Sequence, residues 1–347
     1  MSSARICIVP KVSGTGGMVS FRQRLTAGLV RRGMQVCDDL DDGQSDAVLV
    51  IGGTRQLIAL WRARRRGARI VQRLDGRNWL HRLRKTGLRH FLRAEYGNWN
   101  LSWIRSRLAQ RIVYQSEFAR DWWERAVGPT AIPNWVIYNG VDLSVYTPEG
   151  AGKPPADRWR LLLVEGSLMG GYELGLEAAV GLASELSQAQ NIAHSRTAGE
   201  SVELMVVGRV PAETQRRWQQ RSPTPINWAG LQPLEHIPEL DRSAHLLFSA
   251  DLNPACPNAV IEALACGLPV VAFDTGALPE LVVGDAGRVV PYGGDPWRLA
   301  KPDIPALGRA AVEILADQER FRRAARLRAE AAFDLDEMVE RYLEVLL

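Results

Sequence analysis

The sequence predicts an α/β protein made of two doubly wound domains, each a parallel sheet covered by helices on both faces. Three observations lead to this prediction: a length of 347 residues, apolar runs that alternate with helical patterns, and a break in composition near the middle. A chain of this length exceeds what one hydrophobic core usually organises. Continuous apolar strands alternating with helices are typical of parallel sheets buried on both faces.

The first half contains apolar runs that predict buried strands: ICIVP, DAVLVIGG, ARIVQRLDG and QRIVYQS. Phe21, Leu25 and Leu29 recur every four residues, which predicts a helix that ends near Gly33. A second helix is expected over FARDWWERAVG. The run VIYNGV is either a further strand or the turn that leads out of one.

The composition of the chain changes at TPEGAGKPPADR, where the enrichment in Pro and Gly predicts a linker. Strands are then expected at RLLLVEGS, VELMVVGR, INWAG, HLLFSA, PVVAFDT and GRVVPYGG, with helices between them. Residues 321–347 are charged and helical in pattern. We therefore predict a first domain at 1–148, a linker at 149–158, a second domain at 159–325 and closing helices at 326–347.

Composition excludes several classes of protein. No apolar run reaches the roughly 18 residues of a membrane-spanning helix, and the N-terminus has no signal-peptide core, so we expect a cytoplasmic protein. The four cysteines lack paired or zinc-like spacing and are expected to be reduced and structural. The five histidines form no metal-binding pair, and no metal is expected.

The segment Trp61–Arg125 is strongly basic, with 17 Lys or Arg against five acids. Its arginines are interleaved with five aromatic residues: Trp79, Phe91, Tyr96, Trp99 and Trp103. The positive charge exceeds what solubility needs and predicts an anionic partner on one positive face. An anionic membrane or lipid phosphate is favoured, because indoles and cations suit that interface. A nucleic acid is the alternative, but no nucleic-acid-binding motif accompanies the segment.

A glycine-rich turn, SGTGGMVS, follows the first strand and precedes the first helix. The backbone amides at Gly16 and Gly17 are candidates for contact with a phosphate or sugar on the acceptor side. The turn is not a dinucleotide fingerprint, since Val19 occupies the third glycine position. Close packing of strand against helix explains the glycines nearly as well.

Asp75 follows the strand IVQRL in the turn LDGRNW. That position is the carboxyl edge of a parallel sheet, where ligands bind, so Asp75 is a candidate catalytic carboxylate. A turn-forming Asp before Gly is an equally good interpretation. His81 lies nearby in sequence, although a core or surface role is the simpler expectation for it.

The most informative stretch is FSADLNPACPNAVIEALACGLPVVAFDTGALPELV. Asn258 is placed to cap a helix through Val260–Cys266, and such a helix start suits a diphosphate. Glu262, one turn into this helix, is a candidate to accept hydrogen bonds from ribose hydroxyls. A second glycine-bearing turn, DTGALPE, follows the next strand.

These residues resemble the retaining glycosyltransferases of family 4 (glycosyl transferases group 1), which have the GT-B fold. Glu262 begins EALACGLPVV, similar to the second half of the family's donor motif, and DTGALPELV resembles its second donor turn. VIYNGVDLSVYTP resembles its interdomain strand. The resemblance is specific over Asn134–Pro148 and Asn253–Val282 and topological elsewhere.

The resemblance implies two Rossmann-like domains facing a cleft, with a C-terminal helix crossing back to the first domain. It implies transfer of a sugar, with retention, from a nucleoside diphosphate donor to a carbohydrate, lipid-linked or other anionic acceptor, without metal or other cofactor. Asp75 and Glu262 are the predicted catalytic residues. The predicted donor contacts, besides Glu262, are Gly170, Gly171, Arg209, Asn253, Ala255, Cys256, Pro257, Asn258, Thr275, Gly276, Ala277 and Leu278.

The sequence departs from the family pattern at charged positions. The first donor glutamate is replaced by Pro254, with Asp251 or Asn253 as candidate substitutes. The basic pair that neutralises the diphosphate is replaced by Ser167 and Tyr172. Stabilisation of leaving-group charge is usually a large catalytic term, so Arg209 and amides near Gly170–Gly171 are expected to supply it. A non-catalytic nucleotide-sugar or carbohydrate binder, a sugar-nucleotide epimerase and a nucleic-acid binder remain alternatives.

Overall fold

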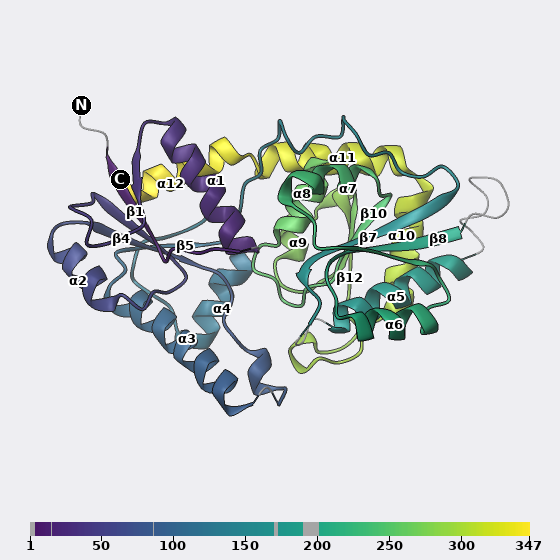
Figure 1. The fold of residues 1–347 in the computed structure, drawn as a ribbon, viewed down its shortest axis with the longest axis horizontal. Helices are drawn as coiled ribbons and strands as arrows, with labels where there is room; N and C mark the ends of the chain where they lie inside the picture. Colours follow the sequence, from purple (N-terminus) through teal and green to yellow (C-terminus); the bar gives the residue numbers. More distant parts are fainter. Residues whose placement is uncertain (1–3, 15, 86, 170–172, 190–200) are drawn as a thin grey trace. The chain divides into compact units, whose positions relative to one another are not determined.

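A computed structural model describes residues 4–14, 16–85, 87–169, 173–189 and 201–347. The chain divides into two compact units (Figure 1). Unit 1 comprises Met1–Gly140 and Leu335–Leu347, and unit 2 comprises Val141–Asp334. The divisions after Gly140 and Asp334 differ from the boundaries expected after residues 148 and 325.

Unit 1 contains a six-stranded parallel sheet in the order β2-β1-β3-β4-β5-β6. Its strands are β1 (Arg5–Val9), β2 (Gln35–Cys37), β3 (Ala47–Ile51), β4 (Arg69–Leu74), β5 (Arg111–Tyr114) and β6 (Asn134–Val136). The four strands predicted from apolar runs are thereby confirmed. VIYNGV is mainly the turn that leads out of β6, and the short edge strand β2 was not predicted.

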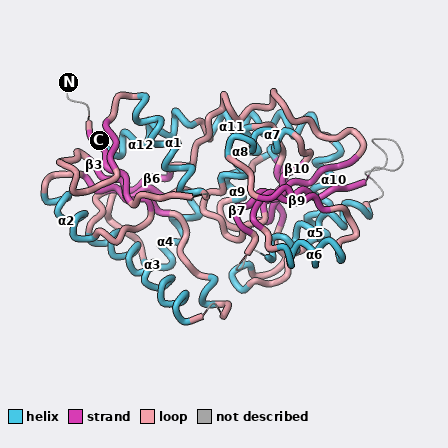
Figure 2. The backbone as a smooth tube through the Cα atoms, in the orientation of Figure 1, coloured by secondary structure: helices cyan, strands magenta, loops and turns pink. Residues whose placement is uncertain are grey.

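Helices cover both faces of this sheet, as Figure 2 shows. The helices of unit 1 are α1 (Gly17–Arg31), α2 (Leu57–Arg65), η1 (Leu80–Arg82), α3 (Leu88–Arg107), α4 (Glu117–Val127) and α12 (Leu335–Leu346). Ile6 and Ile8 pack with α1 and α12, whereas Cys7 and Val9 pack with α2 and α3. The central strand β3 is apolar at every position because its successive side chains enter two different cores.

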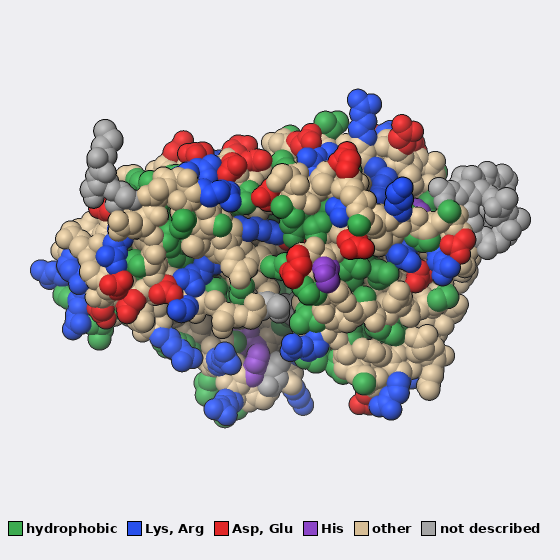
Figure 3. All heavy atoms as spheres, turned by 45° about the horizontal axis from the view of Figure 1, so that its top comes forward, with side chains coloured by type: hydrophobic (Ala, Val, Ile, Leu, Met, Phe, Trp, Pro, Cys, Tyr) green, Lys and Arg blue, Asp and Glu red, His purple; other side chains and the backbone are tan. Residues whose placement is uncertain are grey.

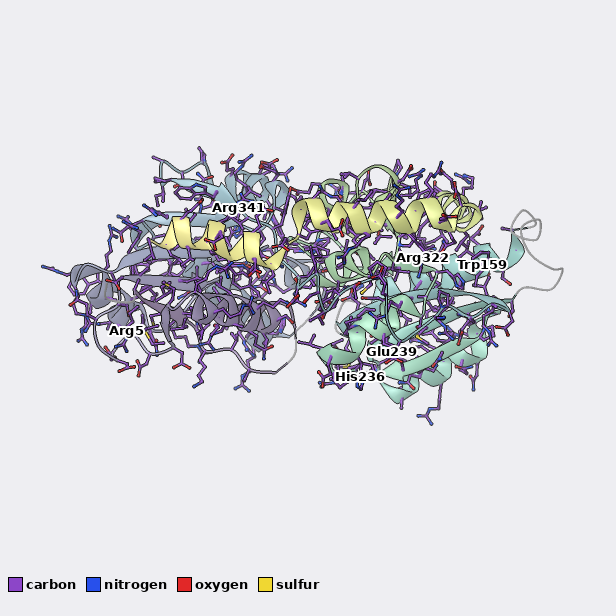
Figure 4. The ribbon with its side chains drawn as sticks, turned by 90° about the horizontal axis from the view of Figure 1, so that it is seen from above. Arg5, Trp159, His236, Glu239, Arg322 and Arg341 are labelled. Atoms are coloured by element: carbon purple, nitrogen blue, oxygen red, sulfur yellow. The ribbon has the colours of Figure 1, made fainter. Side chains whose placement is uncertain are left out.

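The end of the chain returns to unit 1 through α12 alone. Leu335, Met338 and Val339 follow helical spacing and are buried against unit 1. A Cβ at Gly28 of α1 would lie 2.5 Å from Val339 Cγ2, so the glycine permits close helix contact. Arg341, labelled in Figure 4, donates from Nη2 to Val136 O of the same unit over 2.6 Å.

Unit 2 contains the second six-stranded parallel sheet, in the order β12-β11-β10-β7-β8-β9. Its strands are β7 (Arg158–Ser167), β8 (Ser201–Arg209), β9 (Ile226–Gly230), β10 (Leu246–Ser249), β11 (Val270–Phe273) and β12 (Gly287–Val290). All six predicted strands are confirmed. The strand order reverses between β7 and β10, and such a switch point is where doubly wound folds bind ligands.

The helices of unit 2 also lie on both faces of its sheet (Figure 2). They are α5 (Glu173–Gln188), α6 (Ala212–Arg221), η3 (Leu234–His236), α7 (Ile237–Arg242), α8 (Asn258–Ala265), α9 (Leu278–Leu281), η4 (Gly284–Ala286), η5 (Pro296–Arg298), α10 (Ile304–Ala316) and α11 (Gln318–Ala332). α5 and α10 share one core with the sheet, and α11 packs on α8. Arg322 of α11 (Figure 4) donates to Ala244 O over 3.1 Å, which ties this helix to the start of β10.

The sequence predicts one positive face for the basic segment Trp61–Arg125, but the structure does not show one uniform positive face there. Arg73 and Arg105 are 2% and 4% exposed, and they hydrogen-bond within unit 1 instead of facing solvent. Arg82 forms an ion pair with Glu95. The unpaired positive charge is therefore confined to part of the segment.

Candidate functional site: two joined turns at the sheet edge of unit 2

The candidate site is built from two turns that leave adjacent strands of unit 2. β10 and β11 run parallel, so the turns after Ser249 and Phe273 emerge at the same edge of the sheet. Ala277 N donates to Pro254 O over 2.8 Å and joins the two turns. Gly276 has φ 60°, and a Cβ there would lie 2.5 Å from Pro254 O and closer to Pro254 N and Cδ. The turns can approach this closely only because residue 276 is glycine.

The helix α8 begins directly after the first turn. The predicted cap by Asn258 is wrong: Asn258 is the first helical residue, and Pro257 occupies the N-cap position without a side-chain cap bond. Val260 N and Ile261 N both donate to Pro257 O, which gives that carbonyl the role of an N-cap carbonyl. The positive end of the helix dipole still lies beside the turn, as predicted.

Two buried side chains in these turns each have one polar atom without a hydrogen-bond partner among the described residues. Asn253 is 5% exposed and Thr275 is 2% exposed. Within the part of the chain that the structure describes, neither Asn253 Nδ2 nor Thr275 Oγ1 has a hydrogen-bond partner. Buried polar atoms almost always have partners in folded proteins. A bound ligand with acceptor and donor groups would supply the missing hydrogen bonds.

Asn253 is also strained. Its φ of 55° lies in the left-handed region, which residues with a side chain seldom adopt. Asn tolerates this conformation better than most residues, and such strain tends to occur at functional positions. The strain and the buried amide together mark Asn253 as the most unusual residue of the turn.

Glu262 is buried on α8, as the sequence predicted, with 4% of its surface exposed. A second carboxyl group, Asp241 at the end of α7, lies close to it. Burial raises the pKa of Asp241 well above its usual value, and the charge of Glu262 raises it further. Sequence reasoning missed Asp241, because nothing in LEHIPELDRSA marks this carboxyl as buried beside α8.

A further pair of carboxyl groups lies at the switch point between β7 and β10. Burial raises the pKa of Asp251 to about 6. Burial and the neighbouring charge of Asp251 raise the pKa of Glu165 well above its usual value. Asp251 was a predicted substitute for the missing donor glutamate, whereas Glu165 was not predicted, although it stands at the end of a buried strand.

The remaining donor-side candidates fall at or near the same edge. Ala255 and half-buried Pro257 lie in the first turn with buried Cys256, and Leu278 begins α9 after the second turn. Arg209 ends β8 and is exposed there, and its carbonyl accepts a hydrogen bond from Leu168 N over 3.0 Å. Gly170, Gly171 and Tyr172 lie outside the described residues.

The glycine-rich turn of unit 1 leads into α1. Gly16 is the N-cap residue with φ 133°, and Gly17 is the first helical residue, and both are exposed. Among the described residues, a Cβ added at Gly14 or Gly16 would meet nothing within 4 Å. Backbone conformation therefore explains these two glycines, and close packing does not.

Asp75 follows β4 and is half-buried. Burial raises its pKa, and the guanidinium of Arg73 partly opposes this shift. Its carbonyl oxygen accepts a hydrogen bond from Trp123 Nε1 over 2.7 Å, which fixes the turn. Both interpretations of Asp75, turn former and acid, are compatible with this arrangement.

His81 does not serve as a ligand-facing group. It is 5% exposed, and its Nε2 lies 2.7 Å from Glu95 Oε1. The core role expected for a lone histidine is therefore the one that the structure shows. Arg73 was not predicted as a buried residue: its Nη2 donates to Asn139 Oδ1 over 2.7 Å, and its guanidinium lies 3.6 Å from the Phe21 ring centre.

All four cysteines are free thiols, as expected for reduced structural residues. Over the described ranges, no cluster of three or more His, Cys, Asp or Glu side chains is arranged to hold a metal ion. No helix in that part of the chain is both long and apolar enough to cross a membrane.

Comparison with known proteins supports the assignment of the fold. A sucrose-phosphate synthase from Thermosynechococcus elongatus matches with a TM-score of 0.71 at 15% identity, over 99% of this chain and 98% of that one. HepE from Anabaena, solved with UDP and glucose, matches with a TM-score of 0.67 at 16% identity, over 99% of both chains. WaaG, a glycosyltransferase involved in lipopolysaccharide biosynthesis, matches with a TM-score of 0.67 at 12% identity, over 99% of both chains.

The sequence itself matches a family model over residues 181–317, which lie in unit 2. The model is described as Glycosyl transferases group 1. No curated protein sequence matches the chain. The matched range includes the first turn, α8 and the second turn, so the candidate site lies inside it. The chain thus has the GT-B fold of these glycosyltransferases, and its residues 181–317 match the family model described as Glycosyl transferases group 1.

Proposed function

We propose that the chain transfers a sugar from a nucleoside diphosphate donor, bound at the edge of unit 2, to an acceptor held by unit 1. The observation that carries this proposal is the pair of joined turns with two buried polar atoms, Asn253 Nδ2 and Thr275 Oγ1, which have no partner among the described residues. They lie beside the N-terminal end of α8, which favours a negatively charged ligand.

In this proposal the diphosphate lies against residues 255–258 and against the turn Thr275–Leu278. Glu262 accepts hydrogen bonds from the ribose hydroxyls, and Asn253 and Thr275 bind the sugar or phosphate oxygens. Arg209, exposed at the end of β8, supplies positive charge to the leaving group. We infer uridine diphosphate sugars as the first donors to test, because HepE was solved with UDP-glucose.

The transfer forms one bond and breaks one. An acceptor hydroxyl attacks the anomeric carbon, the bond from that carbon to the diphosphate oxygen breaks, and the diphosphate leaves with the electron pair. The hydroxyl proton passes to a base, for which Asp75 is the candidate in unit 1. Retention of configuration and independence from metal are proposed from the family resemblance.

The acceptor side is proposed to take an anionic or lipid-linked molecule, or a polysaccharide. The excess of Arg and Lys in Trp61–Arg125 supports an anionic partner. An anionic membrane surface is one of the proposed partners. A location in the cytoplasm, peripheral to the inner face of the membrane, is proposed with it. The exposed turn at Gly16 and Gly17 is the candidate backbone contact of unit 1.

A non-catalytic nucleotide-sugar binder is the second candidate. The observations that favour it are Pro254 at the position of the first donor glutamate and Ser167 at that of a donor cation. Both candidates require donor binding, so binding alone does not separate them. An epimerase would interconvert donor sugars without any acceptor.

The proposal is tested by thermal shift and calorimetry of the whole chain with UDP-, GDP-, ADP- and TDP-sugars. A ligand at about 100 times its Kd should stabilise the fold by about 2.7 kcal/mol. Glu262→Gln should abolish that stabilisation, whereas Glu213→Gln, in the exposed first turn of α6, should not change it. Hydrolysis or transfer of the bound donor then decides between enzyme and binder. The donor site is contradicted if no nucleotide sugar stabilises the protein or if Glu262→Gln leaves the stabilisation intact.

A further inference from the structure

The first half of α3 carries an apolar stripe that faces solvent. Its members lie at positions i, i+3, i+4, i+8 and i+11 along one side of the helix, and we name this set the α3 stripe: Leu88, Phe91, Leu92, Tyr96 and Trp99. Leu88, Leu92 and Trp99 are 75%, 58% and 51% exposed. Exposed apolar residues are common singly, but a contiguous row of them marks an interaction surface.

The polarity of α3 is reversed over these turns. Its buried positions before residue 100 are Ala94 and Asn98, one small and one polar. Asn98 Oδ1 accepts a hydrogen bond from Asn78 N over 2.9 Å, and Asn98 Nδ2 donates to Asn78 O. An amphipathic helix normally turns its apolar side to the core. Here a side-chain amide anchors the inner face and the bulky apolar side chains are left outside, so folding does not account for the stripe.

Basic side chains flank the stripe: Arg84, Lys85, Arg89 and Arg93. In the described part of the chain none of the four forms an ion pair. The one acid within the same stretch, Glu95, is engaged by Arg82 and His81. The stripe therefore lies in an uncompensated positive field. In Figure 3, Lys and Arg side chains gather with hydrophobic and His side chains at the lower edge of unit 1.

We propose that the first half of α3 docks in the plane of an anionic lipid bilayer. Leu88, Leu92 and Trp99 would enter the boundary between headgroups and acyl chains, and Arg89 and Arg93 would contact lipid phosphates. This assignment follows from the chemistry of the surface, because leucine with Trp and Tyr suits the bilayer interface, and adjacent cations select anionic lipid. A folded protein partner would not need the unpaired cations that flank the α3 stripe.

The geometry allows this contact. Leu88 to Trp99 covers about 18 Å of helix at the usual rise per residue. In Figures 1 and 2 the N-terminal end of α3 extends beyond the strands of unit 1, and Leu88 and Leu92 at this end are largely exposed. The inference rests on the membrane association proposed above and assigns it to one helix. Vesicle binding needs no donor, so its failure is distinguishable from failure of sugar transfer.

The test is flotation of the whole purified protein with vesicles of phosphatidylcholine alone and of phosphatidylcholine mixed with phosphatidylglycerol. The protein should float with the mixed vesicles at low salt, and binding should weaken as salt rises. Leu88→Ser/Leu92→Ser should reduce the partition coefficient by about tenfold or more without changing thermal stability, because both side chains are exposed. Arg89→Gln/Arg93→Gln should remove the preference for phosphatidylglycerol.

Val30→Ser is the matched control, because Val30 is an exposed apolar residue of unit 1 whose neighbours Arg31 and Arg32 are paired with acids. This variant should bind vesicles as the parent does. The proposal is overturned if the parent protein does not float with anionic vesicles, or if the Leu88/Leu92 variant floats unchanged. It is also overturned if the protein does not bind vesicles, and the Leu88/Leu92 or Arg89/Arg93 variant instead loses binding to RNA or DNA or loses self-association.

Discussion

Replacing Gly276 with alanine should separate the two turns of the candidate donor site. Gly276 has φ 60°, and an added Cβ would lie 2.5 Å from Pro254 O and closer to Pro254 N and Cδ. All three atoms belong to backbone or to a closed ring, so no flexible side chain can move away. The Pro254 turn must shift instead, and this shift breaks the bond from Ala277 N to Pro254 O.

The magnitude follows from two separable costs. An L side chain in the left-handed region costs about 1–2 kcal/mol, offset by about 0.4–1 kcal/mol from the lower entropy of the unfolded chain. Loss of a backbone hydrogen bond with a buried acceptor adds about 1–3 kcal/mol. Gly284 has φ 58° with open space around its Cβ position among the described residues, so Gly284→Ala carries the first cost alone. We expect Gly276→Ala to destabilise unit 2 by about 1–3 kcal/mol more than Gly284→Ala.

Urea unfolding of the two variants measures this difference, and titration with the donor found by the binding screen measures its functional effect. Gly276→Ala should weaken donor binding, whereas Gly284→Ala should leave the affinity unchanged. Equal unfolding free energies for the two variants would refute the steric argument. Equal donor affinities would show that the joined turns do not shape the site.

Three further predictions concern single side chains. Burial raises the pKa of Asp251 to about 6, so the folded state keeps a proton that the unfolded chain loses near pH 4. The free energy of unfolding should therefore fall as pH rises from about 4 to about 6. Asp251→Asn should remove this fall in pH-dependent urea titrations. Arg82 and His81 hold the pKa of Glu95 at about 2, so this carboxylate stabilises the fold above about pH 4 and the effect disappears as pH falls toward 2. Glu95→Gln should lower the free energy of unfolding by about 1 kcal/mol at neutral pH and should flatten its dependence on pH below 4. An unchanged pH dependence below 4 would contradict the pairing. Asn253→Gly should keep or raise thermal stability, since φ 55° suits glycine, yet weaken donor binding by about tenfold through loss of the amide, and unchanged affinity would exclude this amide from the site.

The strands were predictable because they obey one simple physical rule. Each lies between two helical layers, so every position from Ala47 to Ile51, and from Val270 to Phe273, must be apolar. The edge strand β2 escaped prediction because its three residues are partly exposed and its pattern is too short to be distinctive. Short edge strands depend on a neighbour for their formation, and the sequence does not reveal that neighbour.

The helix α3 was missed for a different reason. Its large apolar residues from Leu88 to Trp99 do follow helical spacing, but they are interleaved with arginines and are largely exposed. This spacing normally indicates a buried helix face, but the interleaved arginines make the segment resemble a basic, aromatic surface. The spacing shows where a helix runs, whereas burial depends on what the rest of the fold places beside it.

The position of Glu262 on a buried helix was predictable from its motif, and so was the turn before it. The join between Pro254 and Gly276 was not, because it connects residues from two turns whose proximity depends on the pairing of β10 with β11. The pairing of Glu165 with Asp251 has the same origin, in the neighbouring strands β7 and β10. Contacts between turns depend on the order of the strands in the sheet, and a local sequence pattern does not predict that order.

The raised pKa values at this edge bear on how a site without the usual cations holds a diphosphate. A charged carboxylate beside a diphosphate would repel it, whereas a protonated carboxyl group can donate a hydrogen bond. With a pKa of about 6, Asp251 carries its proton for part of the physiological range, and burial and the charge of Asp251 raise the pKa of Glu165 well above its usual value. Donor affinity should therefore fall as pH rises through about 6, and Asp251→Asn, which is neutral at every pH, should lose this dependence. Calorimetric titration with a nucleotide sugar at a series of pH values measures the effect, and an affinity that rises through the same interval would show that the carboxylate itself binds the donor.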